Sequence, residues 1–202
     1  PDGGTTPFKG GKLSTWEGGM RAPCVIRWPG VIKPGSIFTE IFASLDWVPT
    51  LVETAGGPKG NALNEQIQAG KYPGIVKTML DGHNQIDYLT GKSAKAATDV
   101  FLYYSGSRPS AVRYKNWKIY FTMVSDDPAG FIAGPLPYSW AQVVNIKRDP
   151  FETSIGQQYK TLLGTGGAIA AASTAYIYDW NLLPMGQSLW FHELEQYQQF
   201  PP

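Results

Sequence analysis

The sequence predicts an α/β chain that ends in a small antiparallel four-stranded sheet packed by a C-terminal helix. Three segments between Val100 and Met123 have the β-branched and aromatic composition of strands, and short turns separate them. A helix is expected between Thr39 and Ala55, and the apolar spacing from Tyr176 to Phe200 suits further helix packing. The presence of both kinds of pattern in one chain predicts helices and strands together.

Composition is typical of a piece of a globular protein. The chain has 202 residues, of which 43% are hydrophobic and 16% charged, and its net charge is +1. A chain of this size can bury the core of one or two domains. The charge gives no basis for nucleic-acid binding, and no apolar run reaches the roughly 20 residues of a membrane span. No signal peptide opens the chain, but it begins at Pro1 without an initiator methionine, so we expect the natural protein to extend further at its N-terminus.

The first element is a glycine-rich turn that carries a lysine, within the run GGKLSTWEGGMRAPCVIRWPG from Gly10 to Gly30. Glycines on both sides of Lys12 let the backbone approach a ligand closely or adopt positive φ. The segment Ala22 to Trp28 is predicted to be a buried strand that fixes this turn to a scaffold. A cation on a rigid mount suits sulfate or phosphate binding, so Lys12 is the candidate catalytic residue. We expect its amine to face a concave surface that Gly10, Gly11 and Trp16 also line.

This run resembles the block G-x-K-x-[ST]-[TN]-[WYF]-E-G-G-x-R-x-P of the sulfatase family, in which the lysine contacts the sulfate ester. The positions that match are Lys12, Trp16, Glu17, Gly18, Gly19, Arg21 and Pro23. The WPG turn, VIKPGS and SLDWVPTLVETAGG follow in the order seen in that family. The chain is therefore similar to the C-terminal portion of an arylsulfatase-type sulfatase, which implies the alkaline-phosphatase-like α/β fold.

Cys24 is the single cysteine, so an internal disulfide is impossible. The formylglycine of sulfatases is made within a C-x-P-x-R or S-x-P-x-R signature, but the residue after Cys24 is Val25 and then Ile26, without the proline. We expect Cys24 to be a small buried side chain in the predicted strand.

The helix predicted between Thr39 and Ala55 has Asp46 as its N-cap and Pro49 in its first turn, where a missing N–H costs nothing. Three apolar residues at helical spacing would form its core face: Leu51, Val52 and Ala55. Two glycines would end it, Gly56 and Gly57. The polar stretch from Pro58 to Gly74 is expected at the surface, with about one helical turn.

The segment DGHNQIDYLTG, Asp81 to Gly91, resembles the D-G-x-x-x-x-x-x-L-x-G segment that closes the large domain of sulfatases. It predicts a large-domain part over residues 1–91 and a C-terminal subdomain over residues 92–202. The catalytic histidines of the family precede the lysine block, so His83 is expected to be a loop or packing residue. His192, on a late amphipathic helix, is expected to be structural.

The C-terminal subdomain is predicted to hold the antiparallel sheet. Its strands are expected at Val100–Ser105, Ala111–Lys115, Lys118–Met123 and Val143–Lys147, with a helix near Ser188–Gln198 across one face. The same subdomain of sulfatases carries an A-x-R-x-x-x-W-K segment and an N-L-x-x-D-P segment. The matching residues are Ala111, Arg113, Trp117, Lys118, Asn145, Ile146, Asp149 and Pro150.

Arg113 and Lys118 are expected to be solvated or ion-paired. Gly164 to Ser173 is expected to form a connector, and Pro184 with Gly186 to break the last helical stretch in two.

The resemblance implies a calcium-dependent hydrolase whose formylglycine, calcium ligands and histidines lie outside this chain. Asp126 and Asp127 are expected to be turn residues. Glu17 is expected to accept backbone hydrogen bonds or to pair with Arg21. We therefore expect the isolated chain to bind no cofactor or metal tightly and to be inactive, although Lys12 can supply one cation to a sulfuryl oxygen.

The implied partners are a sulfate ester and the missing N-terminal part of the sulfatase, or another chain, covering the exposed core. The implied compartment is the periplasm or the exterior of the cell. Two alternatives stay open: a phosphate or phosphonate ester hydrolase of the same superfamily, and a non-catalytic interaction module derived from a sulfatase. The upstream sequence would separate the first from a sulfatase, and a second chain over Ala22–Trp28 would identify the second.

Overall fold

The computed structural model describes residues 7–12, 14–74, 78–123, 136–155 and 183–199. The chain divides into two compact units, residues 1–24 with 102–192 and residues 25–101 with 193–202. The domain boundary expected at residue 91 stays a prediction. Asp126, Asp127 and the Gly164–Ser173 connector lie outside the described residues. Within the described residues, none of the helices is both long and apolar enough to cross a membrane.

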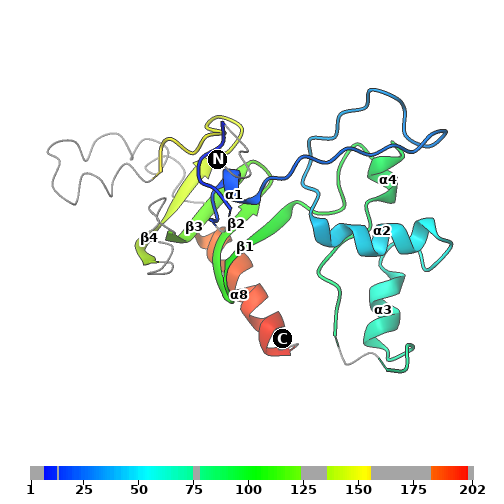
Figure 1. The fold of residues 1–202 in the computed structure, drawn as a ribbon. Helices are drawn as coiled ribbons and strands as arrows, with labels where there is room; N and C mark the ends of the chain where they lie inside the picture. The colour runs from blue at the N-terminus through cyan, green and yellow to red at the C-terminus, as the bar shows by residue number, and fades with distance from the viewer. Residues whose placement is uncertain (1–6, 13, 75–77, 124–135, 156–182, 200–202) are drawn as a thin grey trace, which may run out of the picture. The chain divides into compact units, whose positions relative to one another are not determined.

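The first unit is built around a four-stranded sheet with the strand order β1-β2-β3-β4 (Figure 1). The strands are β1 (Val100–Ser105), β2 (Arg108–Tyr114), β3 (Trp117–Met123) and β4 (Leu136–Asn145). Strand β3 pairs antiparallel with both β2 and β4. The two-residue link between β1 and β2 can join only antiparallel neighbours. The predicted sheet is therefore confirmed, with β4 beginning at Leu136 instead of Val143.

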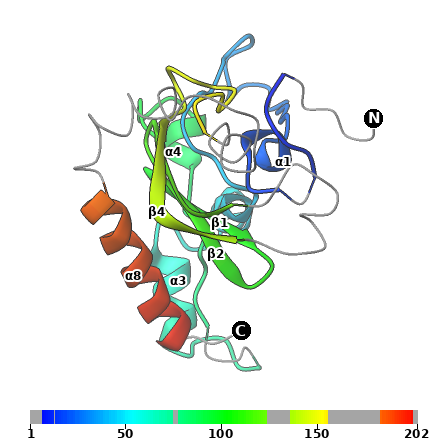
Figure 2. The same ribbon diagram turned by 90° about the vertical axis from the view of Figure 1, so that its left-hand side faces the viewer.

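Other parts of the chain pack on both faces of this sheet. Successive side chains of β3 point to opposite faces. Lys118 and Tyr120 point to the face on which Thr15 lies, and both reach its carbonyl oxygen. Ile119 points to the opposite face, against Gly186 of helix α8 (Leu183–Gln199). Figure 2 shows α8 on one side of the sheet. The predicted helix on one face of the sheet is confirmed.

The break expected at Pro184 and Gly186 is wrong, because both residues lie in the first turns of α8. The first N–H groups of a helix have no intrahelical acceptor, so proline is tolerated there. Packing explains the glycine at position 186, because a Cβ there would lie 2.5 Å from Ile119 Cδ1.

The second unit contains short helices: η1 (Ser44–Asp46), α2 (Trp47–Thr54), α3 (Ala62–Gln68) and α4 (Ile86–Leu89). The helix expected from Thr39 thus begins later, and residues 39–43 are not helical. Its end is as predicted: Gly56 has φ +89° and donates to the Glu53 carbonyl, while Gly57 donates to that of Val52. This pair of bonds is a Schellman motif.

Asp46 lies at the N-cap position of α2, but its carboxylate does not cap that helix. It accepts hydrogen bonds from the backbone N–H groups of Ala43 and His83, at 2.9 and 2.8 Å, and from Gln85 Nε2 at 2.9 Å. Asp46 therefore ties the start of α2 to the loop before α4. His83 lies in that loop, as expected, and is exposed.

The predicted core face of α2 is wrong. Leu51 is 56% exposed and Ala55 is exposed, whereas Pro49 and Thr50 are the buried residues of this helix. The buried position of Thr50 depends on long-range bonding, since its hydroxyl accepts the N–H of Gln85. Helical spacing identified an apolar stripe but not the side of the helix that this unit buries.

The strand predicted at Ala22–Trp28 is also absent from the structure, which has no strand over these residues. Val25 is 95% exposed and Cys24 is exposed, so the prediction of a buried cysteine is wrong here. A strand exists only where a neighbour completes its hydrogen-bond ladder, and none of the described strands pairs with this segment.

Candidate functional site

Lys12 lies at an exposed turn within a closed loop of the first unit. The Gly18 N–H donates to the Lys9 carbonyl at 2.8 Å, which closes the loop, and the Ser14 N–H donates to the Gly11 carbonyl at 3.1 Å next to Lys12. The Ser14 hydroxyl bonds the same carbonyl at 2.7 Å. The turn is thus fixed by its own backbone and presents the Lys12 side chain at the surface.

The glycines of this loop are required by close packing. A Cβ at Gly18 would lie 2.5 Å from the Lys9 carbonyl oxygen, and one at Gly19 would lie 2.4 Å from the Gly11 carbonyl oxygen. Gly10 has φ +77°, and a Cβ there would meet the Ser14 hydroxyl at 2.5 Å. Such separations are far below van der Waals contact, so side chains at these positions would force the loop apart.

The surface around Lys12 differs in one respect from the expectation. Gly10 and Gly11 are exposed beside Lys12, but Trp16 is only 2% exposed and cannot line a binding surface. Its ring lies 5.0 Å from that of Tyr120 and beneath the ammonium group of Lys9 at 3.8 Å. Trp16 therefore anchors the loop to the sheet.

A buried charge cluster lies below the loop, formed by Glu17, Lys118 and Glu152. The three side chains are 1%, 0% and 0% exposed. Lys118 Nζ lies 2.8 Å from the Thr15 carbonyl oxygen, 2.9 Å from Glu17 Oε1 and 3.2 Å from Glu152 Oε1. An ammonium group has three protons, and here each has an acceptor. The rings of Tyr103 and Tyr120 lie 3.9 and 4.7 Å from the same nitrogen.

Glu17 connects this cluster to the rim of the loop. Besides Lys118, its carboxylate accepts hydrogen bonds from the Tyr103 hydroxyl at 2.8 Å and from Arg21 Nε at 2.5 Å. Arg113 NH1 lies 3.8 Å from Glu17 Oε2. The predicted pairing of Glu17 with Arg21 is confirmed, and Arg113 and Lys118 are ion-paired, as expected.

Glu152 approaches the loop from the segment after β4. Its Oε2 accepts the Glu17 N–H at 2.8 Å, and its Oε1 accepts the Tyr120 hydroxyl. Its backbone φ is +53°, an uncommon conformation for a residue other than glycine. Asp149 fixes the residues that follow, because its carboxylate accepts the N–H and hydroxyl of both Thr153 and Ser154.

The pKa values in the cluster follow from burial and charge. Burial raises the pKa of Glu17, but the Lys118 charge, its hydrogen bond and Arg21 outweigh burial and lower it from 4.5 to about 2. Burial raises the pKa of Glu152 despite the nearby Lys118, and burial lowers the pKa of Lys118 despite both carboxylates. Burial together with Glu17 raises the pKa of Tyr103, which stays a hydrogen-bond donor. The Glu17–Lys118 ion pair is therefore the charged centre.

The described residues do not fit a calcium site. No group of three or more histidine, cysteine, aspartate or glutamate side chains gathers among them in a way that could hold a metal ion. The two carboxylates nearest the loop, Glu17 and Glu152, are occupied by Lys118. A calcium ion needs six to eight oxygen ligands. What the described loop offers instead is the exposed ammonium group of Lys12.

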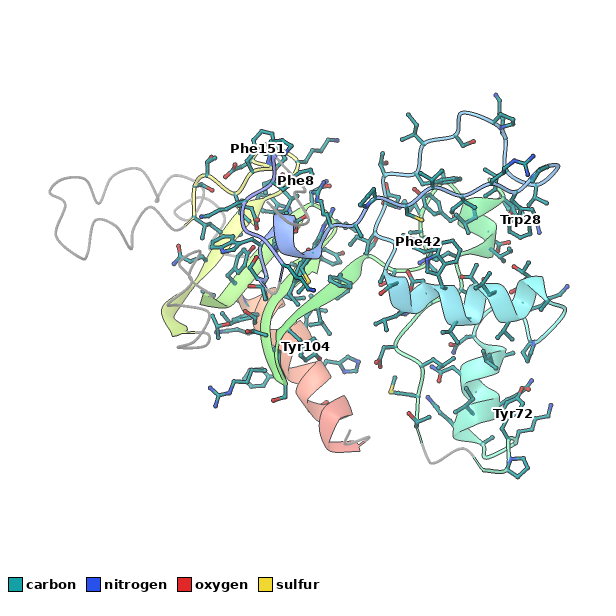
Figure 3. All side chains as sticks on the ribbon, viewed as in Figure 1. Phe8, Trp28, Phe42, Tyr72, Tyr104 and Phe151 are labelled. Carbon is teal, nitrogen blue, oxygen red and sulfur yellow. The ribbon has the colours of Figure 1, made fainter. Side chains whose placement is uncertain are left out.

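The sequence predicted the Lys12 turn, the pairing of Glu17 with Arg21 and a solvated or ion-paired Arg113. It did not predict that Glu17 meets Lys118 and Glu152. A signal was present, since Lys118 follows Trp117 and precedes three apolar residues in a predicted strand. A lysine whose side chain is buried in such a strand is almost always paired with an opposite charge. The aromatic contact that holds the segment bearing Glu152 was also missed: the Phe8 and Phe151 ring centroids lie 6.0 Å apart. Figure 3 labels both residues.

Comparisons with known proteins agree with the resemblance seen in the sequence. The chain is 31% identical over 129 residues to the steryl-sulfatase of Homo sapiens, which is 61% of this chain and 20% of that protein. It is 28% identical over 172 residues to arylsulfatase A of Homo sapiens, covering 78% of this chain and 29% of that protein. No family model matches the chain. The chain spans about a fifth of the length of the steryl-sulfatases that it matches.

The fold also has a solved counterpart. The PsFucS1 sulfatase from Pseudoalteromonas sp. superposes with a TM-score of 0.71 and 22% identity, over 96% of this chain and 34% of that chain. This similarity confirms the predicted fold class, a C-terminal part of the sulfatase α/β fold with a small antiparallel sheet.

Proposed function

We infer from these similarities that the chain belongs to the sulfatase family, and we propose that it is the C-terminal portion of an arylsulfatase-type sulfate-ester hydrolase. The proposal rests on the Lys12 turn, whose sequence resembles the sulfate-contacting block of that family. Glycines keep the turn tight, and a buried ion pair holds its base. Lys12 is left exposed at its tip.

In this proposal Lys12 donates a hydrogen bond to a sulfuryl oxygen of the substrate. The ammonium group also stabilises negative charge that develops on the leaving oxygen in the transition state. The calcium ligands and formylglycine would be supplied by the rest of the protein, because the described residues hold no group of side chains suited to a metal ion and Cys24 lacks the formylglycine signature. We therefore expect the 202-residue chain alone to be inactive and to bind calcium weakly.

The rest of the protein would cover an apolar surface of the second unit. Several large apolar side chains of this unit are exposed: Val25, Ile37, Leu45, Val48 and Leu51. Leu45, Val48 and Leu51 follow one another at intervals of three residues. Exposed apolar groups of this extent mark contact with another body of protein. The proposed occupant is the N-terminal part of the sulfatase, and the proposed compartment is the periplasm or the exterior of the cell.

The test is hydrolysis of an aryl sulfate by the complete protein that contains this chain. Lys12→Ala is expected to lower kcat/KM by about 100- to 1,000-fold, the loss seen when one oxyanion donor is removed. Lys33→Ala is the matched control, since Lys33 is also an exposed lysine in a turn-rich segment. Equal activity of the Lys12 and Lys33 variants would refute the role of Lys12.

An aryl phosphate assayed in parallel distinguishes the alternative hydrolase. A higher kcat/KM for the phosphate than for the sulfate would favour the phosphate or phosphonate ester hydrolase. Turnover of neither ester by the complete protein would favour the non-catalytic interaction module.

A further inference from the structure

The described contacts that fasten the loop carrying Lys12 to the sheet lie at the base of the loop. Lys9 Nζ donates to the Ile155 carbonyl at 2.6 Å, and the Glu17 N–H donates to Glu152 Oε2 at 2.8 Å. Both ends of the loop are thus bound to the segment that follows β4. Lys118 binds the Thr15 carbonyl at 2.8 Å between these two points.

These hydrogen bonds and ion pairs depend on direction, whereas contacts between apolar side chains do not. The three acceptors around Lys118 Nζ fix the position of the Thr15 carbonyl and of the Glu17 side chain together. A buried ion pair gives little net stability compared with well-packed apolar residues of the same volume. The directional bonds of the charged cluster instead fix the position of the loop relative to β3.

Glu152 has the same character. Its carboxylate reaches the Glu17 N–H from a backbone with φ +53°, which is unfavourable for a glutamate. The conformation is sustained by Asp149, whose carboxylate accepts the N–H groups of Thr153 and Ser154. The structure thus maintains an unfavourable backbone so that one carboxylate can bind the loop.

We propose that the buried cluster of Glu17, Lys118 and Glu152 positions the Lys12 turn for anion binding, so that the C-terminal sheet contributes to catalysis through Lys12. This inference rests on the proposed function. The three cluster residues are positioning residues, because Lys118 and Glu152 are fully buried and bond to the loop and to one another. Of Lys12 and the three cluster residues, Lys12 is the one proposed to touch the substrate.

A double-mutant cycle in the complete protein tests the inference. Glu152→Gln keeps the size of the side chain but removes the charge and places N–H donors beside Lys118 and the Tyr120 hydroxyl. It is expected to lower kcat/KM for an aryl sulfate by about tenfold, because small displacements of a positioned group cost up to about 100-fold. In the Lys12→Ala background the same substitution is expected to have no further effect.

The matched control is Glu65→Gln, at an exposed position of α3, which is expected to leave kcat/KM unchanged in both backgrounds. An equal loss from Glu152→Gln with and without Lys12 would overturn the inference, because the cluster would then act through general stability. The Lys12→Ala variant alone reports on the proposed function, so failure of that function is seen separately from failure of the coupling.

Hydrogen exchange gives a second readout that is independent of activity. In Glu152→Gln, the amides of residues 9–18 are expected to exchange about tenfold faster, while those of β2 and β3 keep their wild-type rates. Unchanged exchange over residues 9–18 would overturn the inference. If Glu152→Gln does not fold, Tyr120→Phe removes only a hydroxyl, which bonds to Glu152 and to the Thr15 carbonyl of the loop, and is expected to give about a fivefold change in both measurements.

Discussion

Replacing Glu17 with glutamine should remove a defined part of the acid sensitivity of this protein. The Glu17 carboxylate is 1% exposed and bonded to Lys118, Arg21 and Tyr103. These interactions, Lys118 foremost, outweigh burial and lower its pKa from 4.5 to about 2. At about 1.36 kcal/mol for each pH unit, a lowering of this size corresponds to about 3 kcal/mol of stability.

The sign follows from linkage. A carboxyl whose pKa is lower in the folded protein stabilises the fold fully above its unfolded value of 4.5. This contribution is lost as the pH falls through the folded value of about 2. Glutamine at this position cannot titrate. The difference in unfolding free energy between wild type and Glu17→Gln should therefore shrink by about 3 kcal/mol from pH 6 to pH 2.

The assay is urea unfolding of both proteins at intervals between pH 2 and pH 7, followed by near-ultraviolet circular dichroism. Comparing the two proteins at each pH removes the titration of groups that they share. Glu65→Gln serves as the reference, since Glu65 is exposed and its difference from wild type should stay constant. A pH-independent difference for Glu17→Gln would refute the ion-pair reasoning.

Three further substitutions test the packing of the two units, each by urea unfolding. Gly19→Ala should destabilise the protein by about 1–3 kcal/mol, because the new Cβ would lie 2.4 Å from the Gly11 carbonyl oxygen. Asp46→Ala should cost roughly 3 kcal/mol and speed exchange of the His83 amide, since it leaves buried donors unpaired. Lys118→Met should cost about 3–5 kcal/mol, because it removes the cation that the buried carboxylates of Glu17 and Glu152 share.

Each of these has its own control. Gly11→Ala is the comparison for the first, because a Cβ there meets nothing within 4 Å and the backbone of Gly11 does not have a positive φ. Asp87→Ala, at an exposed position of α4, serves for the second, and Lys147→Met, at an exposed position after β4, serves for the third. Equal effects of a substitution and its control would contradict the packing described for that site.

The four-stranded sheet could be predicted because its signals are local. Alternation along β2 and β3 and the two-residue turns between strands depend on neighbouring residues, and antiparallel pairing across a tight turn needs no distant partner. The Lys12 turn was predictable for the same reason, since the glycines that shape it lie within a few residues.

The sequence by itself therefore determined the sheet, the helix packed on it, the end of α2 at Gly56 and the lysine-bearing turn. Only the tertiary structure decided which faces are buried: Leu51 is exposed where a core face was expected, and Ala22–Trp28 has no neighbour to make it a strand. It also decided that Glu17, Lys118 and Glu152 meet, although 135 positions separate the first and last. Burial and ion pairing depend on groups distant in the chain, and local periodicity does not predict which distant groups meet.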